Sequence, residues 1–164
     1  MYGALEVAKY VINYSIETGN EVSNLKLQKL LYYIQAAFLV DEDRKCFNDP
    51  IIAWEYGPVV ESVYKHYKKY GRNDIDDRQE ATKCLKLDEK SIRIVRYKAK
   101  ELDKDDISII NNVVNAYSNV KNPFVLVKKT HEEDPWKNTA INKEITADSI
   151  RNYYNKERGK IYNQ

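Results

Sequence analysis

The segment from Thr130 to Trp136 holds the residues best suited to acid–base chemistry. It places one imidazole, three carboxylates and an indole within a single turn. A metal site or an acid–base site requires such groups to converge on one point, which one segment does not establish. We therefore expect His131 and Trp136 to hold a turn against the core. A hydrolase centred on His131, Glu132 and Asp134 is kept as the alternative.

Other patterns of catalysis and cofactor binding are missing from the chain. The five glycines lie isolated at positions 3, 19, 57, 71 and 159, so no glycine-rich loop is formed to hold a phosphate. The serines lack the spacing of a nucleophile elbow, and neither of the two histidines has another four residues away. Cys46 and Cys84 form neither a C-x-x-C motif nor a zinc pattern. The sequence predicts no enzyme, no cofactor and no metal.

Length and charge restrict the remaining classes of protein. A chain of 164 residues fits one domain, which we expect to cover 1–164. The small number and wide separation of the cysteines, together with the lack of an apolar secretory signal, favour the cytoplasm. No apolar run approaches the roughly 20 residues that cross a bilayer, so we expect no membrane span. The 27 basic and 25 acidic residues are interspersed without a basic stripe, which argues against a nucleic-acid partner.

Apolar residues recur at helical spacing in the first quarter of the chain. One helix is predicted from Ala4, ending at Gly19, and a second from Ser23 or Asn24 to about Val40. The second helix has a narrow apolar face and another stripe that mixes apolar groups with amides. That second stripe consists of Leu25, Gln28, Tyr32, Gln35 and Leu39. Either the domain flanks this helix on both sides, or the amide-bearing stripe meets a partner.

The middle of the chain contains shorter elements. Residues 51–54 are predicted to be extended, and Pro58 suits the first turn of a helix that closes at Gly71. His66 shares an apolar stripe of that helix, so we expect an interior, hydrogen-bonded histidine. Two runs of alternating residues around positions 88–91 predict a small hairpin.

Three further helices are predicted in the last third. One opens at Asp103 with Asp106 as a carboxylate version of a capping box, and one restarts at Pro123. Residues 124–127 are apolar around the whole circumference, which predicts burial on all sides. A last helix is capped by Thr146. The expected fold is mainly α: a compact helical domain of about six helices with a small antiparallel β element.

Three segments together resemble a known family. They are residues 25–35 (LKLQKLLYYIQ), residues 53–60 (AWEYGPVV) and residues 130–136 (THEEDPW). Their order and spacing are similar to those of the SocA-like Panacea antitoxin domain, also described as GepA-like phage-associated protein. Residues 145–154 are similar to the closing helix of that family. The resemblance therefore extends over nearly the whole chain.

The resemblance implies a module that neutralises a cognate toxin of a toxin–antitoxin system by direct contact. A protease is a further implied partner, because one member of the family delivers its toxin to a bacterial protease. A prophage-encoded inhibitor of a host defence protein is the alternative function. The oligomeric state is left open. The residues expected to bind the partner are Gln28, Tyr32, Gln35, Trp54, Tyr56, Gly57, Pro58, Val59, His131, Asp134, Pro135 and Trp136.

Overall fold

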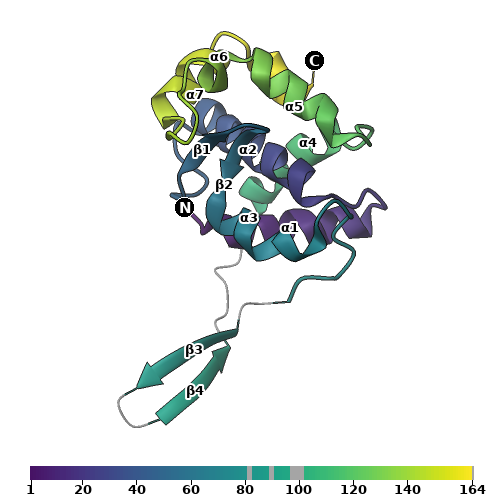
Figure 1. Cartoon of the computed structure of the whole chain (residues 1–164), viewed down its shortest axis with the longest axis vertical. Coiled ribbons are helices and arrows are strands. Elements are labelled where there is room, and N and C mark those ends of the chain that lie inside the picture. Colours follow the sequence, from purple (N-terminus) through teal and green to yellow (C-terminus); the bar gives the residue numbers. More distant parts are fainter. Residues whose placement is uncertain (81–82, 89–90, 97–101, 164) are drawn as a thin grey trace.

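The computed structural model describes residues 1–80, 83–88, 91–96 and 102–163. Over this part of the chain it contains seven α-helices and two small antiparallel hairpins (Figure 1), which confirms the mainly α fold. None of these helices is long and apolar enough to cross a membrane. The elements are α1 (Ala4–Glu17), α2 (Asn24–Asp41), β1 (Ile51–Trp54), β2 (Gly57–Val60), α3 (Glu61–Tyr67), η1 (Lys68–Tyr70), β3 (Lys83–Asp88), β4 (Ser91–Arg96), α4 (Lys104–Ala116), α5 (Pro123–Glu132), α6 (Asp134–Lys137), α7 (Ala147–Tyr154) and η2 (Arg158–Tyr162).

Helix α2 forms the centre of the domain. It begins where the sequence predicts, because the Ser23 hydroxyl accepts a hydrogen bond from the amide of Lys26 at 3.3 Å. Helices α1, α3, α4, α5 and α7 and strand β2 all pack against it (Figure 1). Every residue from Lys26 to Leu39 is therefore buried, and so is all of the amide-bearing stripe except the half-buried Leu25. A helix covered on all sides needs no polar face, which explains its two stripes.

The first hairpin joins β1 to β2, with Ile51 opposite Val60 and Trp54 opposite Gly57. The outer edge of β1 is covered by residues 142–145, through bonds such as that from the amide of Ile145 to the Ile51 carbonyl at 2.8 Å. Pro58 lies in β2, so the prediction that it opens a helix is wrong. Proline is tolerated on an edge strand because it lacks the N–H that a further strand would require. Helix α3 begins only at Glu61.

The other helix starts follow their caps. The side chains of Asp103, Asn122 and Thr146 accept hydrogen bonds from backbone amides in the first turns of α4, α5 and α7. Asp106 does not complete a capping box; it is buried and accepts a bond from the Tyr2 hydroxyl at 2.6 Å. The second hairpin is confirmed, with Asp88 opposite Ser91.

The interior position expected for His66 is wrong. Its side chain is exposed at the end of α3, whereas Val63 and Tyr67 occupy the buried face of that helix. Val63 and Tyr67 lie four residues apart on one side of the helix, and the neighbours of α3 cover that side while leaving the adjacent position of His66 open to solvent.

Candidate functional site

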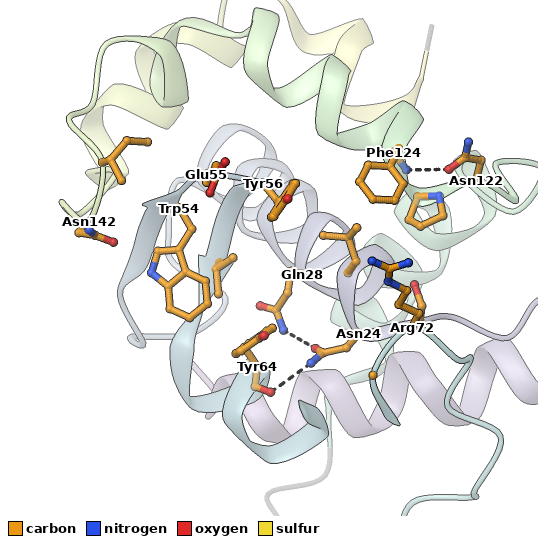
Figure 2. A pocket seen from close by; sticks show the side chains of 16 residues that line it. Asn24, Gln28, Trp54, Glu55, Tyr56, Tyr64, Arg72, Asn122, Phe124 and Asn142 are labelled. Carbon is orange, nitrogen blue, oxygen red and sulfur yellow. Dashed lines mark hydrogen bonds between the residues drawn. The ribbon is translucent and has the colours of Figure 1, made fainter. Parts of the chain in front are cut away.

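A groove with a volume of about 800 Å³ opens where α2 and α5 begin (Figure 2). The β1–β2 turn, Tyr64 of α3, residues 71–72 and the loop around residue 141 form the rest of its walls. Four aromatic side chains line it together with polar ones. The aromatic side chains are Trp54, Tyr56, Tyr64 and Phe124, and the polar ones include Asn24, Gln28 and Arg72.

Large apolar side chains are exposed around this groove. The exposed fractions are 55% for Tyr56, 54% for Phe124 and 49% for Ile141. The rings of Tyr56 and Phe124 meet edge to face, with centroids 6.2 Å apart. Exposed apolar groups gathered in this way mark an interaction site more often than single ones do.

The burial predicted on all sides of residues 124–127 is wrong, and the error concerns this groove. Phe124 and Val125 are exposed, while Leu126 and Val127 are buried. Helix α5 packs against α2, β2 and α6, and these neighbours leave one of its faces open. The sequence contained a signal for the site here, namely more apolar residues than one buried face requires.

The turn that carries Tyr56 is held by close packing beneath it. Gly57 has a φ of +99°, and an added Cβ would lie 2.7 Å from Thr130 Oγ1 and 2.8 Å from Lys29 Cε. No other residue type fits without displacing these atoms. The ammonium group of Lys29 donates to the Pro58 carbonyl at 3.1 Å. Lys29 is fully buried, and burial lowers the pKa of its amine to about 7.

The amide side chains of α2 close the open edges of neighbouring backbone. The amide of Val60 donates to Gln28 Oε1 at 2.9 Å, and Gln28 donates to Asn24 Oδ1 at 3.0 Å (Figure 2). Gln35 accepts from the amide of Cys46 at 3.0 Å and donates to the Phe47 carbonyl at 3.1 Å. Both glutamine side chains therefore bond to backbone groups that have no neighbouring strand, namely the amides of Val60 and Cys46 and the carbonyl of Phe47.

Several of the residues expected to bind a partner lie below the surface. Tyr32 and Gln35 are buried, and Gln28 reaches the groove only at its floor. Pro58 and Val59 are buried in β2. This packing favours the interpretation that the domain flanks α2 on both sides.

His131 and Trp136 stack with ring centroids 3.8 Å apart at the junction of α5 and α6. The Trp136 indole donates to the Trp54 carbonyl at 3.0 Å, which joins this pair to the β1–β2 turn. Burial, together with the nearby Lys29 ammonium, lowers the pKa of His131. This stack and this hydrogen bond support the expectation that the pair holds a turn against the core.

The carboxylates around His131 do not converge on it. Glu132 and Asp134 are exposed. Glu133 is buried and accepts bonds from Tyr154 at 2.7 Å and from Tyr33 at 3.2 Å. Burial raises the pKa of Glu133 to about 7. Across the described ranges no group of three or more histidine, cysteine or carboxylate side chains is placed to hold a metal ion.

The family model described as "Antitoxin SocA-like, Panacea domain" matches residues 27–137. The chain belongs to this family. It is similar to "Antitoxin SocA" of Caulobacter vibrioides (strain NA1000 / CB15N), with 37% identity over 75 residues. That match covers 46% of this chain and 40% of the relative, so it spans less than half of either protein. No solved structure matches the chain.

The matched part of this Panacea domain contains most of the groove. Tyr56, Arg72 and Phe124 lie within the matched residues, whereas Asn24 and Ile141 lie outside them. The residues expected from the sequence to bind a partner include four that line the groove, Gln28, Trp54, Tyr56 and Val59, but not Tyr64, Arg72, Phe124 or Ile141. Arg72 and Ile141 have no local pattern that separates them from ordinary surface residues, so only the fold brings them together.

Proposed function

We propose that the chain is an antitoxin that binds a cognate protein toxin and neutralises it by direct contact, with the groove at the centre of the interface. Membership of the antitoxin family supports the role. The gathering of Tyr56, Phe124 and Ile141 around one groove supports the location and carries this proposal. The function is binding rather than catalysis, and its place is the cytoplasm.

The groove has the physical properties of an interface centre. Aromatic residues dominate binding energy at protein interfaces when they enter well-packed pockets. Tyr56 projects from a turn that Gly57 and Lys29 hold in place, so binding loses little conformational entropy there. Its ring partner Phe124 lies in the first turn of α5, which the Asn122 side chain caps, so Phe124 is also held in place.

Growth of cells that express the proposed cognate toxin tests the proposal. Co-expression of this chain should restore growth, and Tyr56→Ala should weaken the complex by roughly thirtyfold, as expected for a hot spot of about 2 kcal/mol. Because Tyr56 is 55% exposed, its loss should leave the melting temperature nearly unchanged. Lys68→Ala, on an exposed side chain of η1 outside the groove lining, is the control and should protect like the wild type.

Two results would contradict the proposal. A wild-type chain that neither binds that toxin nor restores growth would exclude the antitoxin role for this pair. Protection that Tyr56→Ala and Phe124→Ala both leave intact would place the interface elsewhere on the domain.

A further inference from the structure

We propose that the groove receives a short peptide segment of the partner that carries one large apolar side chain and, close to it, a carboxylate. This inference rests on the proposed function and adds the chemistry of the segment that is recognised. The size of the groove, its aromatic walls and the distribution of charge around it support this chemistry.

The size of the groove fits side chains of a segment better than a folded surface. Its volume of about 800 Å³ lies within the range of sites that enclose small ligands. A folded partner covers roughly 800 Å² of each protein in a standard interface, spread over a much flatter area. A recess of this kind therefore receives an anchor that projects from the partner.

The walls offer aromatic edges and faces to an apolar anchor. Trp54 and Tyr64 meet edge to face with centroids 5.0 Å apart on one side, and Tyr56 and Phe124 form the second pair. An inserted aromatic or large aliphatic side chain would cover groups that water now contacts. Aromatic pairs add about 0.5–1.5 kcal/mol to the energy of area burial, so an aromatic anchor is favoured.

The charge around the groove favours a carboxylate on one side. Arg72 and Glu55 are the charged residues that line it, and Tyr56 lies between them in the view of Figure 2. Arg72 is exposed and makes no ion pair with a carboxylate among the described residues, so its guanidinium donors are open to a ligand. Helix α2 begins beside it with no acidic residue in its first turn, which adds to the positive potential. Glu55 disfavours a second carboxylate at the opposite side.

Selection from a phage-displayed library of random heptapeptides tests this chemistry. The wild-type chain should enrich peptides that combine an aromatic or large aliphatic residue with Asp or Glu. The Arg72→Glu variant should lose the acidic preference and select Lys or Arg in its place. Lys68→Glu makes the same change in net charge on an exposed side chain of η1 outside the groove lining, and it should select the wild-type motif.

Binding of one enriched peptide, synthesised with a fluorescent label, makes the test quantitative. Arg72→Glu should weaken its affinity at low salt by about tenfold or more, and added salt should reduce the difference. Enrichment without an acidic preference, the same preference in Arg72→Glu, or no enrichment at all would overturn the inference. A dimer in light scattering that Tyr56→Ala dissociates, without peptide selection, would overturn it in favour of a second copy as occupant.

The growth assay separates failure of this inference from failure of the antitoxin proposal. If the wild type and Arg72→Glu protect cells equally well, the antitoxin role is supported, but the proposed recognition of a carboxylate by Arg72 is refuted. If the wild type gives no protection, the antitoxin role fails whatever the peptides show.

Discussion

Replacing Gly57 with alanine tests whether the turn that carries Tyr56 depends on close packing. The added Cβ would lie 2.7 Å from Thr130 Oγ1 and 2.8 Å from Lys29 Cε, well inside ordinary contact distances. Lys29 is fully buried and bonded to the Pro58 carbonyl, so it has little space into which to move. The clash must therefore displace the turn or break that hydrogen bond.

The cost has two parts. A φ of +99° is unfavourable for a residue with a Cβ, and strain of this kind costs about 1–2 kcal/mol. Overpacking of a filled interior adds about 1–3 kcal/mol. We expect Gly57→Ala to lower the free energy of unfolding by about 2–5 kcal/mol.

Chemical denaturation followed by circular dichroism measures this loss. Gly19→Ala is the matched control, because Gly19 also has a positive φ of +66° but nothing lies within 4 Å of its added Cβ. The control should lose only the strain part, about 1 kcal/mol. Equal losses in the two variants would refute the idea that packing against Lys29 and Thr130 requires glycine at this position.

Further predictions concern the buried ionisable groups. The pKa of Glu133 is raised from 4.5 to about 7, so between these pH values the folded state binds a proton that the unfolded state has lost. The free energy of unfolding should therefore fall as pH rises from 4.5 to 7. In urea titrations the Glu133→Gln variant should show a smaller fall over this pH range. The pKa of Lys29 is lowered from 10.5 to about 7, so the unfolded state binds the extra proton and stability should rise from pH 7 toward 10, by at most about 1.4 kcal/mol per pH unit. A rise that persists in Lys29→Met would contradict this assignment. Asp106→Ala removes the acceptor of the Tyr2 hydroxyl and the partner of Arg44, and should lower the free energy of unfolding by about 2 kcal/mol. The control Asp105→Ala changes an exposed neighbour and should lower it by less than about 0.5 kcal/mol. Equal losses in the two variants would refute the role of the buried carboxylate.

Local sequence determined where most helices begin and end. Ser23, Asp103 and Thr146 cap the helices that they were expected to cap, and Gly19 follows the end of α1 with a positive φ. These features depend on residues within one turn of each other, so periodicity and cap chemistry suffice to predict them. The family resemblance was also a property of the sequence alone.

The tertiary structure decided which faces are covered. The apolar stretch 124–127 holds more apolar residues than one buried face requires, but it does not indicate that Phe124 is the exposed one, because exposure depends on neighbours distant in sequence. The amides of α2 could equally have faced a partner, and only the fold shows that Gln28 closes the edge of β2. The groove joins residues from 23 to 142, so its existence rests on contacts that no local pattern encodes. Burial is a property of the assembled chain, whereas helix formation is largely a property of each segment.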